Sequence, residues 1–343
     1  DEAIRRNPAH LGAWLNRGNA HSDLGDHEAG RGGDPRPQYD LAVADFDQGL
    51  LLNPELAAAY NNRGLVRKSL GRWLEGRNLD PREVLGKAVA DFEQSLSRNP
   101  RSADARLNLA LTRVAVGNAE EARGGDPRDS YRKAAEDCDE VLERNGEDVE
   151  GFNTRAIAWA SLGDFESAEG RDASEAYAKA VADFGELLKR NPEHAQAYRN
   201  RGSVRANLAG ALAAQGKDAR GTYREAISDF GEALRRNPGY TAALSARADA
   251  WREVARAEEK AGEDSSGSLA KSMADYDAAL ARNPSYWQAH VGRGQVLESR
   301  GEHAKAVEAY ESAQKALGER DPKIDDRIRR AREKAGLPPD AER

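Results

Sequence analysis

The sequence repeats itself every 46 residues, and this period constrains the fold more than any other feature of the chain. Asn-Pro marks the end of each repeat, with Asn145-Gly146 at the one place where the proline is missing. The asparagines of this column are Asn7, Asn53, Asn99, Asn145, Asn191, Asn237 and Asn283. Self-similarity at a period of roughly 20–50 residues indicates a tandem array in which each repeat buries its apolar side against its neighbours.

The period divides the chain into four parts. Residues 1–10 match the end of a preceding repeat's second helix, 11–286 hold six 46-residue repeats, 287–320 one 34-residue repeat, and 321–343 a capping helix and tail. The chain therefore starts inside a repeat, and residue 1 is not Met. We expect the natural protein to continue upstream, so the compartment stays open, with the cytoplasm favoured.

Each repeat is predicted to form two helices. On the first, residues such as Tyr60, Arg63 and Gly64 lie on one stripe of 3.6-residue spacing. A small residue recurs on that stripe in every repeat: Gly18, Gly64, Ala110, Ala156, Gly202, Ala248 and Gly294. Because a glycine inside a helix costs roughly 1 kcal/mol relative to alanine, this column predicts a close approach of a neighbouring helix.

The second helix has a readable start, face and end. In the second repeat Ala88, Phe92 and Leu96 follow one another at four-residue spacing on one side. An aspartate recurs as a predicted N-cap at Asp34, Asp80, Asp126, Asp172, Asp218 and Asp264. Two residues earlier stand residues that tolerate the left-handed conformation, which are Gly32, Asn78, Gly124, Gly170, Gly216 and Gly262.

A small residue on the first helix, Ala-x-x-x-Phe on the second and a terminal proline resemble the tetratricopeptide repeat, whose usual length is 34 residues. Repeat seven, residues 287–320, resembles an ordinary member, and the other six resemble one with twelve inserted residues. The resemblance implies an all-α, right-handed superhelical solenoid of antiparallel helix pairs. Asp321-Pro322, with Ile324 and Ile328 behind it, predicts a C-terminal helix that caps the last apolar face.

The inserted residues carry a periodic column of their own: Tyr39, Leu85, Tyr131, Tyr177, Tyr223 and Leu269. Its spacing assigns it to the second helix, which should begin at the Asp cap, about two turns earlier than in an ordinary repeat. We expect an unbroken first helix in repeats five and six, and a kinked or interrupted one in repeats one to four at Gly25, Gly71, Gly117 and Gly163. Exposed side chains in the column would favour assembly through the insert, whereas buried ones would favour simple helix extension.

Two charged columns run through the array. Arginines recur on the packed stripe of the first helix at Arg17, Arg63, Arg155, Arg201, Arg247 and Arg293, with Leu109 as the exception. Aspartates recur on the second helix at Asp45, Asp91, Asp137, Asp183, Asp229 and Asp275. Equal and opposite periodicity predicts inter-helix ion pairs and disfavours a nucleic-acid surface, which would need further cations interleaved with aromatics.

Composition and motifs argue against catalysis, cofactors and membranes. The net charge is −7, there is one cysteine, and no apolar run approaches the ~18 residues of a membrane span. The six histidines fall in different columns without metal-ligand spacing, and Cys138 stands in the aromatic column as a core residue. We therefore expect no enzyme, no metal and no cofactor in this chain.

The resemblance places the first helices on the concave face, where extended peptides bind in this family. One column there is rich in asparagine, whose amide offers donors and an acceptor together. With its neighbours it forms the candidate peptide-binding set: Asn16, Asn62, Asn108, Asn200, Asn61, Asn153, Leu111 and Ile157. Leu15, Asp104 and Leu107 stand where the family's carboxylate clamp would need polar or cationic groups. A mixed apolar and backbone-polar ligand therefore fits better than an acidic peptide terminus.

Three functions remain open at this stage. The first is a non-catalytic scaffold that binds a protein or peptide segment along the concave face. The second is an architectural element that self-associates through the inserted helix extensions. The third is a recruiting domain of an enzyme lying upstream of residue 1.

Overall fold

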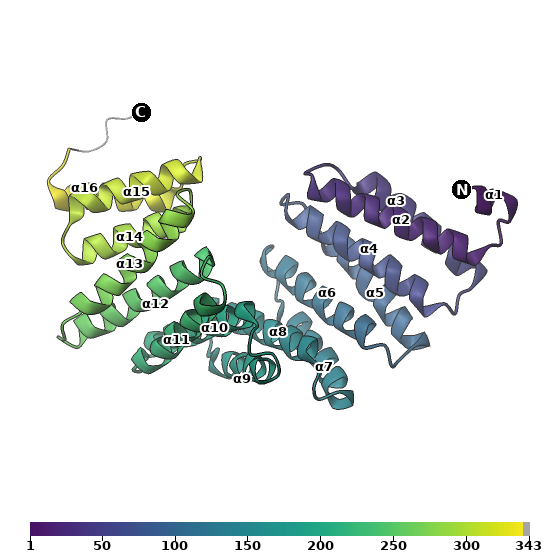
Figure 1. Ribbon diagram of the computed structural model, residues 1–343, viewed down its shortest axis with the longest axis horizontal. Coiled ribbons are helices and arrows are strands. Elements are labelled where there is room, and N and C mark those ends of the chain that lie inside the picture. Colours follow the sequence, from purple (N-terminus) through teal and green to yellow (C-terminus); the bar gives the residue numbers. More distant parts are fainter. Residues whose placement is uncertain (339–343) are drawn as a thin grey trace. The chain divides into compact units, whose positions relative to one another are not determined.

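The computed structural model describes residues 1–338, and within them it contains sixteen α-helices and no strand (Figure 1). The first helices of the seven repeats are α2 (Leu11–Gly30), α4 (Ala57–Glu75), α6 (Ala103–Glu121), α8 (Val149–Ala168), α10 (Ala195–Ala214), α12 (Thr241–Lys260) and α14 (Trp287–Ser299). The second helices are α3 (Arg36–Leu52), α5 (Arg82–Arg98), α7 (Arg128–Arg144), α9 (Ser174–Arg190), α11 (Arg220–Arg236), α13 (Ser266–Arg282) and α15 (His303–Leu317). The short α1 (Glu2–Arg6) precedes them and α16 (Pro322–Ala335) follows.

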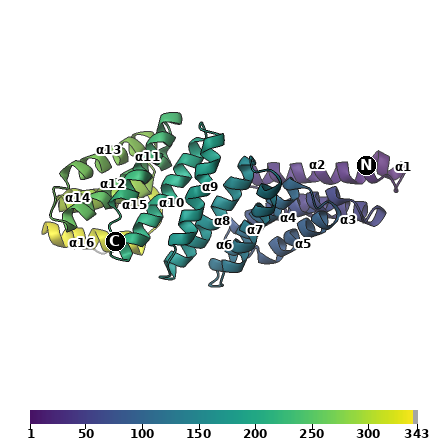
Figure 2. The ribbon, with the colours of Figure 1, turned by 90° about the horizontal axis from the view of Figure 1, so that it is seen from below.

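The helix starts follow the sequence period. All seven first helices begin 46 residues apart, and so do the second helices from α3 to α13. The chain forms two compact units, Asp1–Asp183 (unit 1) and Phe184–Arg343 (unit 2), which are described separately. Within each unit a second helix packs against its own first helix and against the first helix of the next repeat (Figure 2). The predicted all-α solenoid of helix pairs is therefore confirmed.

The small-residue column marks the closest approach of the two helices of a repeat. A Cβ added at Gly64 would lie 2.9 Å from the ring of Phe92, and one added at Gly202 would lie 2.8 Å from the ring of Phe230. Phe92 and Phe230 are fully buried. The prediction of close helix approach is confirmed, and its cause is the aromatic ring of the second helix.

The turn between the two helices contains the predicted left-handed residue and aspartate. Asp80 Oδ1 accepts a hydrogen bond from the backbone N–H of Arg82, the first residue of α5, at 3.0 Å. The N-cap residue itself is Pro81, so the predicted N-cap aspartate lies one residue before it. The Arg82 guanidinium, bonded to the same carboxylate, lowers the pKa of Asp80 to about 2. Asn78 has φ 57°, and the five glycines of its column also have positive φ. Left-handed residue and capping aspartate together end one helix and start the next.

The expected break in the first helices of repeats one to four is wrong. Helices α2, α4, α6 and α8 each run unbroken for 19 or 20 residues. The glycines serve packing instead, because a Cβ at Gly117 would lie 2.5 Å from the ring of Tyr131, and one at Gly71 would lie 2.4 Å from Leu85. The bulky side chain of the insert thus occupies the space that a glycine leaves open.

The twelve inserted residues lengthen mainly the first helix. It has 13 residues in repeat seven and 19 or 20 in the others. The second helix has 17 residues against 15, and it starts about one turn earlier relative to the core alanine. The expected two-turn extension of the second helix is therefore too large.

The insert column is buried throughout. Tyr39, Leu85 and Tyr131 are 1% exposed, and the least buried member, Tyr223, is 7% exposed. These side chains extend the core of each helix pair. Because these side chains are buried, the inserted residues extend the helices and their column does not form an exposed surface for assembly.

The C-terminal helix covers the last repeat. Asp321 Oδ1 accepts hydrogen bonds from the backbone N–H groups of Lys323 and Ile324, and Gly336 ends α16 at φ 66°. The apolar side of α16, with Ile324 and Ile328, packs into the core of α14 and α15. The predicted capping helix is confirmed, and residues 339–343 of the tail lie outside the described residues.

Candidate functional site

The first helices of unit 1 form one continuous side of that unit. Each contacts the first helix of the next repeat, α2 with α4, α4 with α6 and α6 with α8, and the second helices pack behind them. We call this side the first-helix face of unit 1. It is defined by Asn16, Asn19, Asn61, Asn62, Leu65, Lys68, Leu107, Asn108, Leu111, Asn153 and Ile157.

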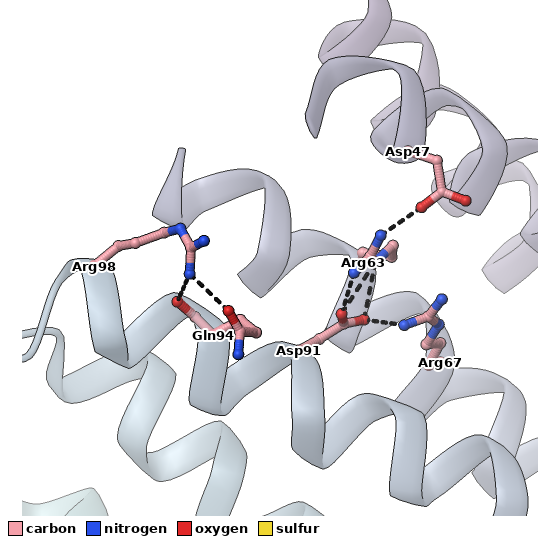
Figure 3. A network of polar contacts seen from close by, with 6 residues as sticks. All are labelled: Asp47, Arg63, Arg67, Asp91, Gln94 and Arg98. Atoms are coloured by element: carbon pink, nitrogen blue, oxygen red, sulfur yellow. Dashed lines mark hydrogen bonds and ion pairs between the residues drawn. The ribbon is translucent and has the colours of Figure 1, made fainter. Parts of the chain in front are cut away.

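An ion-pair network fixes the helices behind this face (Figure 3). Arg63 on α4 donates three hydrogen bonds to the two oxygens of the buried Asp91 carboxylate on α5, and its Nη1 donates to Asp47 of α3 at 2.5 Å. Arg67, one turn along α4, donates to Oδ2 of Asp91 as well. A single arginine therefore links three helices and two repeats.

The two charged columns meet as predicted. Five intra-repeat pairs form: Arg17–Asp45, Arg63–Asp91, Arg155–Asp183, Arg201–Asp229 and Arg247–Asp275. Two repeats, three and seven, deviate for reasons visible in the sequence. Arg293 pairs with Asp277 of the preceding repeat, because the short repeat seven has no aspartate at the matching place. The inter-helix interpretation of the columns is thus confirmed.

Repeat three is the other deviation. Leu109 replaces the column arginine, so Asp137 is held instead by Arg113, with Arg106 3.9 Å away. Burial raises the pKa of the Asp137 carboxyl to about 6, against the opposing effect of Arg113. One buried carboxylate of unit 1 therefore lacks the bidentate partner of its equivalents.

The amides of the candidate set join neighbouring first helices. Asn62 Nδ2 donates to Asn19 Oδ1 at 3.1 Å, across the contact of α4 with α2. Asn108 Oδ1 accepts from Lys68 Nζ at 2.8 Å, across the contact of α6 with α4. Asn61 Nδ2 donates to Asn62 Oδ1 at 3.4 Å. Part of each amide's hydrogen-bonding capacity is used within the protein, and the Oδ1 of Asn61 is buried without a hydrogen-bond partner among the described residues.

The remaining candidate residues are less closely associated. Asn16 is exposed on α2, and Asn153 is half-buried on α8. Asn200 belongs to unit 2, where its Oδ1 accepts from Arg199 Nη1 at 3.1 Å. The structure thus places Asn61, Asn62 and Asn108 on neighbouring helices of unit 1. Asn200 belongs to unit 2 and is not part of this group.

Apolar side chains cross the middle of the same face. Leu65, Leu111 and Ile157 occupy one column on α4, α6 and α8. Leu65 and Ile157 are half-buried and pack against core clusters, as does Leu107. Leu111 is the exception, because 37% of it is exposed.

Sequence reasoning missed Lys68. Burial and the neighbouring charge of Arg72 lower the pKa of the Lys68 ammonium. Its column continues with Val114 and Ala160, so no periodicity marked the residue. Only the contact of α4 with α6 brings it to Asn108.

Three observations bear on metal, membrane and thiol chemistry. Among residues 1–338, no group of three or more His, Cys, Asp or Glu side chains is arranged to hold a metal ion. None of the described helices combines the length and apolarity needed to cross a membrane. Cys138 is buried, and burial raises the pKa of its thiol above the ordinary value.

Comparison with known proteins gives a consistent family. The model of the tetratricopeptide repeat family matches residues 85–125, 171–219 and 264–322. A tetratricopeptide repeat protein from Parabacteroides merdae ATCC 43184 is similar in structure, with 16% identity, TM-score 0.53, and coverage of 92% of this chain and 99% of that one. At this identity the likeness concerns the fold alone. A search of curated proteins gave no match.

Two further solved structures have lower TM-scores. TTC0263, a thermophilic TPR protein of Thermus thermophilus, is 20% identical over 68% of this chain and 98% of that one, with TM-score 0.44. The TPR2AB domain of yeast Sti1, solved in a pHSP90 complex, is 16% identical over 95% of this chain and 99% of that one, with TM-score 0.32.

The fold and its repeat columns define an all-α repeat protein made of antiparallel helix pairs. Tetratricopeptide repeats match the chain in three segments, and the same helix pair recurs through six repeats of 46 residues in place of the usual 34. Proteins of this family generally mediate protein–protein interactions, and their fold is usually a non-catalytic scaffold.

Proposed function

We propose that the chain is a protein-interaction scaffold whose first-helix face of unit 1 binds an extended protein segment. The observation that carries the proposal is Leu111, which is 37% exposed in the middle of a column whose other members are half-buried. Covering such a side chain removes apolar surface from water, which favours binding.

Polar groups beside Leu111 suit the backbone of such a segment. Asn108 lies one turn before Leu111 on α6, and its Oδ1 already accepts from Lys68. Its two N–H donors make no hydrogen bond among the described residues, so they are available to a carbonyl oxygen of a ligand. Asn62 offers a second amide one helix away. Contacts of this kind recognise backbone regardless of side-chain sequence.

The helices that carry these groups are held in place before binding. Arg63 ties α3, α4 and α5 together, and Lys68 ties α4 to α6. A surface fixed in advance loses less conformational entropy when a ligand binds. The cations of a carboxylate clamp are absent at Leu15, Asp104 and Leu107. We therefore expect a ligand with an apolar residue flanked by neutral backbone.

The test is selection from a random-peptide display library on the full chain, followed by affinity measurements. Asn62→Ala/Asn108→Ala should weaken the selected peptides by about tenfold or more. The matched control is Gln48→Ala/Gln94→Ala, which removes two amides from the second helices. Equal affinities for the two double variants would overturn the proposal. Concentration-dependent self-association without peptide selection would support the architectural alternative instead.

A further inference from the structure

Buried tyrosines of the insert column have a fixed hydrogen-bond partner. The residue thirteen positions earlier, on the first helix, accepts from the hydroxyl: Asp26 from Tyr39 at 2.7 Å, and Asp164 from Tyr177 at 2.8 Å. In repeat three the partner is Asn118, which accepts from Tyr131 at 2.9 Å. Where the column carries Leu85 or Leu269, an arginine stands at the partner position. Tyrosine and acceptor therefore occur together.

Repeat five breaks this rule. Tyr223 is 7% exposed, and the residue thirteen positions earlier is Gly210. A Cβ at Gly210 would lie 3.7 Å from the Tyr223 hydroxyl oxygen, so the place of the missing side chain is open. Within the described residues the hydroxyl has no hydrogen-bond partner. Burial, reinforced by Glu253, raises the pKa of Tyr223 to about 12, so the hydroxyl remains a donor at neutral pH.

A cavity of about 700 Å³ occupies this place, between α10, the start of α11 and the end of α12. Gly210 and Tyr223 line it, together with the alanine side chains Ala213, Ala214 and Ala257. Its volume lies in the range of ordinary small-ligand sites, roughly 300–1,000 Å³. The cavity therefore combines an apolar wall with an unused hydroxyl donor.

Positive charge predominates around the cavity. Lys217, Arg220, Arg256 and Lys260 line it, against the two carboxylates Asp218 and Glu253. Arg220 is bound to Asp218 and Glu263, and Arg256 lies 3.8 Å from Glu253. Lys217 and Lys260 form no ion pair among residues 1–338. Two cations thus remain for an anionic guest.

We propose that this cavity binds a carboxylate carried on a short aliphatic stem, with the Tyr223 hydroxyl donating to the carboxylate. The bound carboxylate would take the place that the side-chain carboxylates of Asp26 and Asp164 occupy in repeats one and four. Lys217 and Lys260 balance its charge, and the alanine wall covers the stem. The carrier is either a small organic acid or the glutamate side chain of a partner segment, and the two share this chemistry. The site lies in unit 2, so it is independent of the first-helix face of unit 1.

The test titrates the full chain with butyrate, with acetyl-glutamyl methylamide, with butanol and with inorganic phosphate, and follows the backbone amide resonances of Gly216 and Ala219. Butyrate binding alone supports the site with a small organic acid as its ligand, and binding of acetyl-glutamyl methylamide, with or without butyrate, supports the site with a glutamate side chain as its ligand. Butanol binding equally well, inorganic phosphate binding equally well, or neither carboxylate binding overturns the proposal.

Two variants locate the effect. Tyr223→Phe removes the donor, and Gly210→Asp supplies the carboxylate of the sister repeats, so each should weaken butyrate roughly tenfold or more. Gly210→Asp should also raise the melting temperature, because it satisfies Tyr223. Tyr39→Phe, the matched change in unit 1, should leave butyrate affinity unchanged. Unchanged affinity in a folded Gly210→Asp variant would contradict the assignment.

Discussion

Units 1 and 2 use the same repeat but cross-link it differently. In unit 1 Arg63 and Arg155 each bind two carboxylates, one on the second helix of their own repeat and one on that of the preceding repeat. In unit 2 the places of the second carboxylate hold Gly185 and Gly231, so Arg201 and Arg247 each lack the bridge to the preceding repeat. Arg293 in repeat seven of unit 2 does reach the preceding repeat, at Asp277. The first-helix face that we propose as a binding surface therefore lies beside the two column arginines, Arg63 and Arg155, that each bind two carboxylates.

The two units also differ in the residue against which the insert column packs. The position on which the insert column packs is Gly25, Gly71, Gly117 and Gly163 in unit 1, and Ala209 and Ala255 in unit 2. The cavity beside Tyr223 also belongs to unit 2. The 46-residue period is therefore the same in both units, while single residues within it change the helix packing and form a cavity in unit 2.

The largest effect is expected from removing a column arginine. Arg63→Met leaves the buried Asp91 with Arg67 alone, and we expect the free energy of unfolding of unit 1 to fall by about 3 kcal/mol. Arg201→Met is the matched variant in unit 2, because Asp229 keeps Arg205 in the same way. It should cost less by about 0.5–1 kcal/mol, since no equivalent of Asp47 is lost.

Urea unfolding and hydrogen exchange of the α4 and α10 amides measure the loss of stability in the two arginine variants. A cost for Arg201→Met equal to or above that of Arg63→Met would show that the second carboxylate, Asp47, adds no stability.

A smaller change in the free energy of unfolding is expected when a glycine of either unit is replaced by alanine, and its sign should differ between the units. Gly117→Ala forces a methyl group against the Tyr131 ring and should lower the free energy of unfolding by about 1–3 kcal/mol. Gly210→Ala finds open space near Tyr223 and should raise it by up to about 1 kcal/mol, the gain in helix propensity. Thermal unfolding monitored by circular dichroism compares the two. Stabilisation by both variants would show that the ring of Tyr131 does not select glycine.

The smallest effect concerns pH and the one repeat of unit 1 without its arginine. The folded-state pKa of Asp137 is raised to about 6, so the folded chain binds this proton more tightly than the unfolded chain. Stability is therefore lost as the pH rises from about 4 through 6, by about 1–2 kcal/mol after allowance for solvent screening.

Asp137→Asn removes this titration. Its stability relative to the unsubstituted chain should increase between pH 4 and pH 7, as measured by urea unfolding across that range. A stability difference that is independent of pH would place the pKa of Asp137 near its ordinary value.

The features that could be predicted from the sequence are those that recur in every repeat. Helix pairs, aspartate caps, left-handed turn residues and the Arg63–Asp91 type of pair all recur at one period, so the evidence for each is multiplied. The glycines at Gly25 and Gly71 were misread as helix breaks, because their selection depends on a ring or leucine on the antiparallel partner helix.

Features that occur once were beyond reach. Lys68 meets Asn108 only through the packing of α4 on α6, and no column marks it. The cavity at Tyr223 follows from a single glycine, whose meaning depends on knowing that the other tyrosines bond thirteen residues back.

The most direct test of the account is where a selected peptide contacts the chain. A photo-reactive benzoylphenylalanine at position 111 samples the first-helix face of unit 1, and one at position 41 replaces Leu41, a leucine of α3 that is 49% exposed. We predict cross-linking of the peptide to the chain labelled at position 111 and not to the chain labelled at position 41. Cross-linking at position 41 alone, or equally at both, would contradict a binding surface formed by the first helices.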